Sequence, residues 1–399
     1  MQAPFLATAE KTKDRIKSWT QLALEKASGA TPVLFDHSMD NAAPVISTGS
    51  VVRSMLGHFQ FQPGGLSKVF KTSDKSGPLA NTAAVIPLGK SLHETLLLSL
   101  HRSEQDDLPA WEQEPPTLGK IMGKPTFPKG RNDLYTRLTR SVLLLPDDLE
   151  GRTVRFIRYA EGAALAENPN MPEPMAAYVQ GKTSRFTLAF REERAFWRDL
   201  PALLPDPGAP QDLHPRILDD STDLLSDVRE DCPLTVTVSG LTSDQAKLVR
   251  WATVSFALSR ALLDRESTTL ATLRHFILQA EETSNEVRKL AENAFRLAFP
   301  RSKEGGHSLP ASLVCSTYLS VQVPELLKLL SENVTDPADM WTNVRMKAAR
   351  RAWDAVRDAL GSSLPVIVAL AKTEPKFEQL LAGLKKQLSE PGETGKGEP

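Results

Sequence analysis

The sequence predicts an α+β protein, with an irregular mixed α/β N-terminal domain followed by a C-terminal four-helix bundle. Two observations carry this prediction. Glycine, proline and short strand patterns dominate the first part of the chain, whereas apolar residues recur at helical spacing from Thr242 onward. The chain of 399 residues is also longer than the chain that one hydrophobic core usually stabilises. We therefore expect domains at residues 1–240 and 241–390, and a disordered Gly-, Glu- and Pro-rich tail at 391–399.

The N-terminal domain is expected to hold short elements. Ile16, Trp19 and Leu22 recur at helical spacing and predict a helix within the first 30 residues. Glycines and prolines from Gly29 to Leu92 leave room for short regular structure only, and a helix over His93 to Leu100 follows. Strands are expected where β-branched and aromatic residues gather, at 141–145, 152–159, 186–190 and 234–238.

Four apolar stripes at helical spacing predict the bundle. Asp336-Pro337 fits an N-cap followed by a proline in the first turn, and Pro324 should kink or divide the third helix. The stripes are Leu248, Trp251, Leu258 and Leu262; Leu273, Ile277, Ala280, Val287 and Ala291; Leu319, Val323, Leu326 and Leu330; and Trp341, Val344, Ala348 and Ala352.

Composition narrows the class of protein. Hydrophobic residues make up 41% and charged residues 24%, as in soluble globular proteins, and no run of eighteen apolar residues predicts a membrane span. The first residues mix Lys and Glu too early for a signal-peptide core. Cys232 and Cys315 cannot form a four-thiolate zinc site and indicate a reducing cytosol. We therefore expect a cytoplasmic protein without a metal or other cofactor.

The formal net charge of −1 means that a nucleic-acid binder of this composition must gather its positive charge locally. Such gathering occurs between residues 120 and 158, although each of these side chains alone also fits a solvated surface. The residues are Lys120, Lys124, Lys129, Arg131, Arg137, Arg140, Arg152, Arg155 and Arg158.

Motifs of enzymes are not found in the sequence: it has no Walker loop, nucleophile elbow, H-E-x-x-H or dinucleotide fingerprint. Asp36-His37 places an acid beside an imidazole, which suits a metal or acid–base fragment. Neighbouring residues of an extended chain point in opposite directions, so adjacency alone makes no site. A loop pair with a structural or binding role is the alternative.

Several segments, in order, resemble the large-subunit (CasA) family of the type I-E CRISPR surveillance complex, Cascade. The resemblance begins at residue 4, earlier than is usual in that family, which indicates a shortened subunit, a truncated chain or a mis-assigned start. Some members also carry extra cysteines suited to zinc, and this chain does not. The segments are Pro4-Phe5-Leu6, Leu34-Phe35-Asp36-His37 with Asp40, Phe61 to Gly65, Gly89 to Leu100, Pro109-Ala110-Trp111-Glu112 and Ala195 to Leu200.

The resemblance implies a non-enzymatic protein that works in a complex. Its expected partners are the other Cascade subunits, the guide CRISPR RNA, double-stranded target DNA and a helicase-nuclease. Guide RNA reads the target by base pairing, while protein reads a short flanking motif, the protospacer-adjacent motif. Two alternatives are a metal-dependent hydrolase or nuclease using Asp36 and His37, and a helical scaffold without nucleic-acid contact.

The resemblance also implies DNA-binding residues. Gly64 and Gly65 match a glycine loop whose backbone approaches a sugar-phosphate edge, and an ordinary turn after Pro63 is the alternative. Lys182 resembles a lysine that enters the groove, with Arg185 as the candidate if the alignment shifts.

Two further segments complete the expected site. Asp244-Gln245-Ala246 aligns with a wedge whose glutamine inserts at a base step. Thr242 to Gln245 equally fits a capping box that opens the first bundle helix. Phe35, Asp36 and His37 match a loop near the guide handle and the flanking DNA, where Phe35 stacks on a base or is instead a buried anchor.

Overall fold

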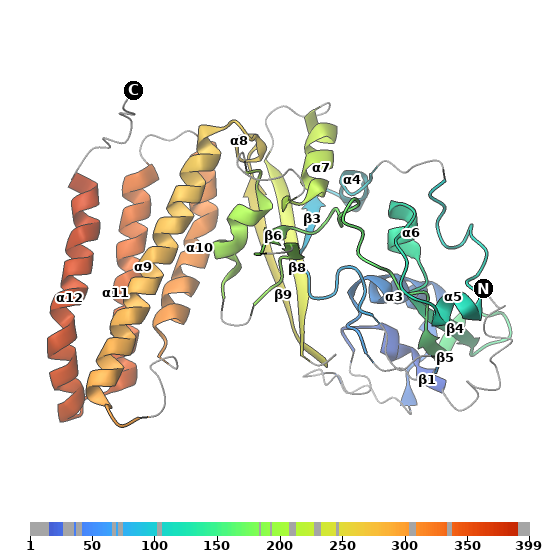
Figure 1. The fold of residues 1–399 in the computed structure, drawn as a ribbon, viewed down its shortest axis with the longest axis horizontal. Coiled ribbons are helices and arrows are strands. Elements are labelled where there is room, and N and C mark those ends of the chain that lie inside the picture. The colour runs from blue at the N-terminus through green and yellow to red at the C-terminus, as the bar shows by residue number, and fades with distance from the viewer. Residues whose placement is uncertain are drawn as a thin grey trace.

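The computed structural model consists of three parts arranged along one long axis (Figure 1). A small α/β part contains the N-terminal elements, a three-stranded sheet lies in the middle, and four long helices form the other end. The structure describes residues 16–26, 36, 42–65, 69–70, 75–101, 106–182, 185–191, 194–206, 213–226, 233–244, 247–302, 309–332 and 337–389.

The N-terminal part is built around strand β5 (Thr153–Glu161), which pairs antiparallel with three other strands. These strands are β1 (Ile16–Ser18), β2 (Ile46–Ser47) and β4 (Arg140–Pro146). Helix α3 (Thr48–Phe61) and the 3₁₀ helix η1 (Trp19–Leu22) pack on this sheet and share a small core with it. Two short helices, α5 (Leu118–Met122) and α6 (Arg131–Thr136), lie beside it.

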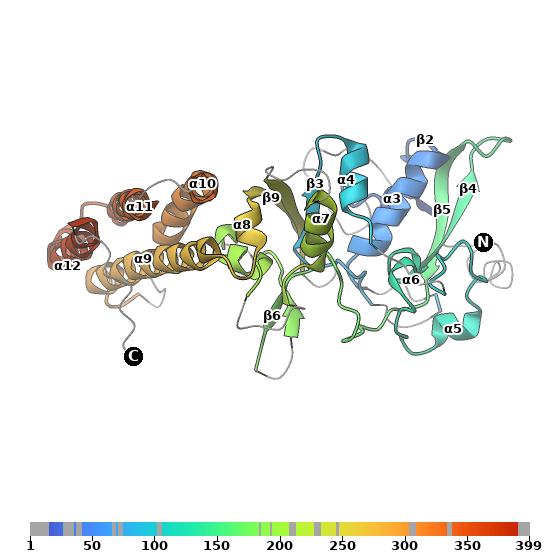
Figure 2. The same cartoon turned by 90° about the horizontal axis from the view of Figure 1, so that it is seen from above.

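The middle part is an antiparallel sheet in the order β3-β8-β9, formed by β3 (Ala84–Leu88), β8 (Leu234–Asp244) and β9 (Lys247–Leu258). Helices α4 (Leu92–Leu98), α7 (Arg216–Ser226) and α8 (Arg260–Leu263) surround this sheet (Figure 2). The 3₁₀ helix η3 (Phe196–Leu203) packs against two of the long C-terminal helices. In sequence, a small hairpin of β6 (Tyr178–Gln180) and β7 (Arg185–Thr187) comes after the N-terminal part.

The C-terminal part consists of α9 (Thr268–Ala298), α10 (Ala311–Ser331), α11 (Pro337–Leu360) and α12 (Leu364–Ser389), packed side by side. One continuous hydrophobic core joins them to the middle sheet. The indole N–H of Trp197 in η3 donates to the Ser316 carbonyl of α10 at 3.2 Å. By length and composition alone α10 is apolar enough to cross a membrane, but Leu319, Val323 and Leu326 bury one side of it in this core.

The predicted α+β class with helices at the C-terminal side is confirmed. The second, third and fourth apolar stripes lie on α9, α10 and α11 and are buried. Pro337 begins α11 as predicted, whereas α10 runs through Pro324 as one helix. Strands predicted at 141–145, 152–159, 186–190 and 234–238 overlap β4, β5, β7 and β8.

Three predicted elements are wrong. Three of the four residues of the first bundle stripe lie on strand β9, and the fourth, Leu262, lies on α8. On β9 Trp251 is 40% exposed and Leu258 is fully buried, because the period of a strand is two and places them on opposite faces. Ile16 to Leu22 forms β1 and η1 rather than one helix. The stretch expected to hold only short structure contains the 14-residue helix α3.

The domain division remains a prediction. A boundary at residue 240 would cut β8, so we propose instead that the helical part begins at Thr268. The tail at 391–399 lies outside the described residues.

Candidate nucleic-acid interface

The strands β8 and β9 form a ribbon that extends beyond the end of β3. Strand β3 pairs only with Thr235 to Ser239, and beyond this point β8 has β9 as its partner up to the pair Asp244–Lys247. Gly240 stands at the transition, where an added Cβ would lie 2.5 Å from the carbonyl oxygen of Thr82. Glycine is therefore needed for the ribbon to pass this backbone closely.

Of the predicted wedge, the structure describes Asp244, which lies at the end of this ribbon. Asp244 is the last residue of β8, while Gln245 and Ala246, which connect it to Lys247 of β9, lie outside the described residues. Asp244 pairs with Lys247, and this is the last described pair of the ribbon. The alternative that Thr242 caps a helix is wrong, because Thr242 pairs with Arg250 inside the sheet.

The predicted glycine loop lies beside the ribbon. Helix α3 ends at Phe61, whose ring makes an edge contact with Trp251 of β9 at a centroid distance of 5.8 Å. Gly64 and Gly65 follow within four residues and are partly exposed. Trp251 pairs with Leu241, three residues before Asp244, which corresponds to about 10 Å along a strand. The fold thus brings the glycine loop and the distal ribbon together.

Buried polar contacts fix the start of the glycine loop. The Gln62 side chain accepts a hydrogen bond from Arg140, and its backbone carbonyl accepts from the N–H of Gly77 at 2.9 Å. Arg140 also donates to the Lys75 carbonyl at 2.9 Å and to the Tyr159 hydroxyl at 3.0 Å. Arg140 is therefore a structural residue that anchors the loop, and the expected role in surface charge does not apply to it.

Lys182 follows β6, before β7, and is exposed. No hydrogen bond or ion pair joins its side chain to another residue in the described part of the chain. Arg185, the alternative candidate, is instead held in place: its guanidinium stacks 4.7 Å from the Tyr178 ring and donates to the Pro169 carbonyl at 2.8 Å. Of these two basic residues, Lys182 is therefore the one whose side chain has freedom to reach a ligand.

The Phe35-Asp36-His37 segment is described only at Asp36. Its carboxylate lies 4.0 Å from the Lys26 ammonium group, which follows η1. Phe35 and His37 lie outside the described residues. Within the described ranges, no group of three or more His, Cys, Asp or Glu side chains is placed to hold a metal ion.

Sequence reasoning named Phe61 and Trp251 separately but missed their contact, which lies at the start of the glycine loop. The sequence does carry a pattern that indicates the strand on which Trp251 lies. Val249, Trp251, Thr253 and Ser255 alternate with residues of the opposite face, which is the period of a strand. The apparent helical spacing of Leu248, Trp251 and Leu258 hid this alternation.

Comparisons with known proteins agree over almost the whole chain. The family model described as CRISPR-associated protein Cse1 matches residues 1–396. The CRISPR-associated protein CasA/Cse1 of Thermus thermophilus is 32% identical over 401 aligned positions, covering 96% of this chain and 78% of the relative.

Solved structures show the same fold. A crystal structure of CasA from Thermus thermophilus has a TM-score of 0.76 and 27% identity, covering 94% of this chain and 77% of the other. A chain from a structure described as a CRISPR RNA-guided surveillance complex has a TM-score of 0.68 and 21% identity, covering 94% and 80% of the two chains. The chain therefore belongs to the CRISPR-associated Cse1 family, also called CasA.

Proposed function

We propose that this chain is the non-catalytic large subunit of a type I-E guide-RNA surveillance complex, in which it recognises the protospacer-adjacent motif of double-stranded DNA. Membership of the Cse1 family supports the proposal that this chain assembles into such a complex. The partners would be the other Cascade subunits, the guide RNA, the target duplex and the helicase-nuclease that the bound subunit recruits. Phe35, Asp36 and His37 would lie near the guide handle.

The observation that carries the proposal is the two-stranded ribbon with the glycine loop beside it. Gly64 and Gly65 have no Cβ, so their backbone can approach a sugar-phosphate edge closely. Lys182 would enter the minor groove, whose degenerate acceptor pattern suits several related motifs. Asp244, at the far end of the ribbon, would insert at the adjacent base step together with Gln245 and Ala246, which follow it in sequence, and would help to separate the strands.

A lysine substitution tests the reading of the motif. We expect Lys182→Ala to weaken binding of the assembled complex to motif-bearing duplexes, and Lys182→Arg to keep part of the affinity through its charge. If Lys182 reads a groove edge, discrimination between motifs should relax by about 1–3 kcal/mol. If it contacts a phosphate, the loss should be similar for all motifs, and the salt dependence should become shallower.

The matched control is Lys90→Ala, which removes the same charge from another exposed loop position. Affinities are measured by fluorescence anisotropy over a range of salt concentrations and of flanking motifs. Unchanged affinity and unchanged discrimination for Lys182→Ala, or equal losses for the control, would remove Lys182 from the interface.

A further inference from the structure

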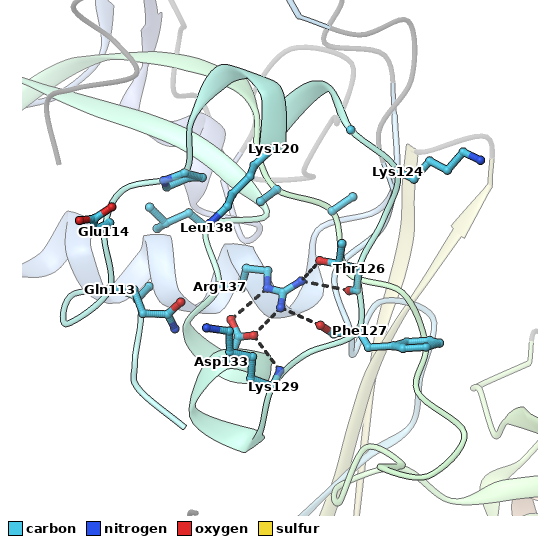
Figure 3. Close-up of a pocket in the computed structure, with 15 residues that line it drawn as sticks. Gln113, Glu114, Lys120, Lys124, Thr126, Phe127, Lys129, Asp133, Arg137 and Leu138 are labelled. Atoms are coloured by element: carbon cyan, nitrogen blue, oxygen red, sulfur yellow. Dashed lines mark hydrogen bonds and ion pairs between the residues drawn. The ribbon is translucent and has the colours of Figure 1, made fainter. Parts of the chain in front are cut away.

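A hollow of about 580 Å³ lies on the N-terminal part, between α5, α6 and the loop that joins them (Figure 3). Its lining includes four basic side chains, Lys120, Lys124, Lys129 and Arg137, against two acidic ones, Glu114 and Asp133. Small apolar residues such as Ala163 and Ala164 contribute to the same lining. The hollow therefore combines an excess of positive charge with apolar surface.

Arg137 builds this hollow rather than serving a ligand. Its guanidinium donates to both carboxylate oxygens of Asp133, to the carbonyl and hydroxyl oxygens of Thr126 at 3.0 and 2.9 Å, and to the Phe127 carbonyl at 3.0 Å. These contacts use all five N–H donors of the side chain. Burial of Asp133 favours its neutral form, but these hydrogen bonds and the nearby positive charges lower the pKa of its carboxyl overall.

The loop from Gly123 to Gly130 is fixed at several points. The Thr126 backbone exchanges hydrogen bonds with Ala164 and Ala166 at 3.2 and 2.9 Å, and the Lys129 N–H donates to Asp133 at 2.9 Å. At Gly130 an added Cβ would lie 2.3 Å from the carboxyl carbon of Asp107. The side chains of this loop are therefore presented by a backbone with little freedom to rearrange.

Three lysines remain available to a ligand. The side chains of Lys120 and Lys124 form no hydrogen bond or ion pair with any residue that the structure describes, and all three lysines are exposed. Lys120 and Lys124 do not converge on one point, and Lys124 extends outward, away from the rest of the lining (Figure 3). Ammonium groups set apart in this way suit successive phosphates along a strand, whereas a single phosphate would need converging donors.

Phe127 adds a flat apolar surface on the same loop as Lys124 and Lys129. Its side chain is 58% exposed, although its carbonyl is held by Arg137, and in Figure 3 it points away from Arg137 toward the outside. An exposed aromatic ring among lysines on a fixed loop is the combination that binds single-stranded nucleic acid, because every base has a face that can stack. A hollow of this volume is of the size that takes a small ligand or one part of a strand.

We propose that this hollow binds a single-stranded segment of nucleic acid, with phosphates on Lys120, Lys124 and Lys129 and a base stacked on Phe127. The site does not depend on the motif-reading surface, because none of these residues belongs to the glycine loop, the β6–β7 turn or the ribbon. DNA and RNA strands offer the same phosphates and base faces, so the test compares both.

The test measures binding of the full-length chain to fluorescein-labelled oligo-dT and oligo-U of about 12 nucleotides, within the usual site size. The variant Lys120→Gln/Lys124→Gln/Lys129→Gln should bind at least about ten-fold more weakly, and the slope of log affinity against log salt should fall by about two. Phe127→Ala should lose about five-fold or more, and Phe127→Trp should restore binding. The lysines and Phe127 are exposed, so each variant should keep the wild-type melting temperature.

The matched control is Lys328→Gln/Lys372→Gln/Lys376→Gln, which removes the same charge from exposed positions of α10 and α12. A loss confined to the hollow variants supports the proposal, and a loss for only one of the two strands identifies that strand as the ligand. Equal losses in the control, or unchanged binding in the hollow variants, would overturn it. Neither oligonucleotide carries a flanking duplex, so failure here leaves the motif-reading proposal standing.

Discussion

The buried carboxyl group of Glu173 should make the stability of this protein fall as the pH rises. Glu173 lies between β5 and β6, where its Oε1 accepts from the Tyr135 hydroxyl at 2.5 Å and from the Met175 N–H at 3.2 Å. No hydrogen bond to another described residue reaches its Oε2. Burial raises the pKa of this carboxyl from 4.5 to about 7, against the opposing effects of the two hydrogen bonds and of Arg131.

The sign and magnitude follow from proton linkage. The folded protein binds the Glu173 proton more tightly than the unfolded chain, so stability falls as the pH rises from 4.5 to about 7. A shift of this size corresponds to about 3 kcal/mol. Glu173→Gln keeps the shape and the acceptor for Tyr135 but cannot ionise. The difference in unfolding free energy between variant and wild type should therefore move in favour of the variant by about 3 kcal/mol across that window.

Urea unfolding, followed by tryptophan fluorescence at a series of pH values, measures this difference. His58 titrates in the opposite sense, because burial, then the charges of Arg140 and Lys17, lower the pKa of its imidazole from 6.5 to about 3. That contribution loses stability as the pH falls through this range, but it is common to both proteins and cancels in their difference. A difference that stays constant with pH would refute the buried, ionisable state of Glu173.

Two substitutions test other contacts. Phe61→Ala removes the ring contact with Trp251, which is worth about 0.5–1.5 kcal/mol. Motif-bearing duplexes should therefore bind the complex more weakly in anisotropy measurements. Unchanged binding would show that this contact does not hold the glycine loop in place beside the ribbon. Trp353→Ala removes a fully buried indole that stacks on Phe377 at a ring-centroid distance of 5.0 Å. It should lower the free energy of unfolding in urea by about 3–5 kcal/mol. A loss below about 1 kcal/mol would contradict the packing of α11 on α12.

The long C-terminal helices were predictable because their buried residues repeat at the helical period over many turns. Ala280, Val287 and Ala291 of α9 illustrate this pattern. Helix α12 was missed, since Pro365 and Pro375 interrupt the pattern. The expected number of four helices therefore rested partly on a stripe that belongs to β9 and α8. Helix α3 was missed because Gly49 and Gly57 look like breakers, although an added Cβ at Gly57 would meet open space.

The candidate site was predictable only as separate segments. The resemblance pointed to Gly64 and Gly65, but their position beside the ribbon depends on the contact between Phe61 and Trp251, which are 190 residues apart in sequence. For the basic residues between 120 and 158, the sequence likewise does not show which side chains are used within the protein. Lys124 and Arg137 look equivalent in sequence, but Arg137 uses all its donors within the protein and Lys124 remains exposed.

Strand separation next to the flanking motif tests the central claim most directly. The reconstituted complex is mixed with target DNA that carries 2-aminopurine at the first base step beside the motif, and the rise in fluorescence reports opening. Gln245→Ala should bind the flanking duplex and melt like wild type, but open the strands more slowly, because the unstacked step loses its support. A bubble already melted at that step should restore the rate, and Gln322→Ala on α10 should behave as wild type throughout. Opening at the wild-type rate by Gln245→Ala on intact duplex would contradict the assignment of the ribbon end as the wedge.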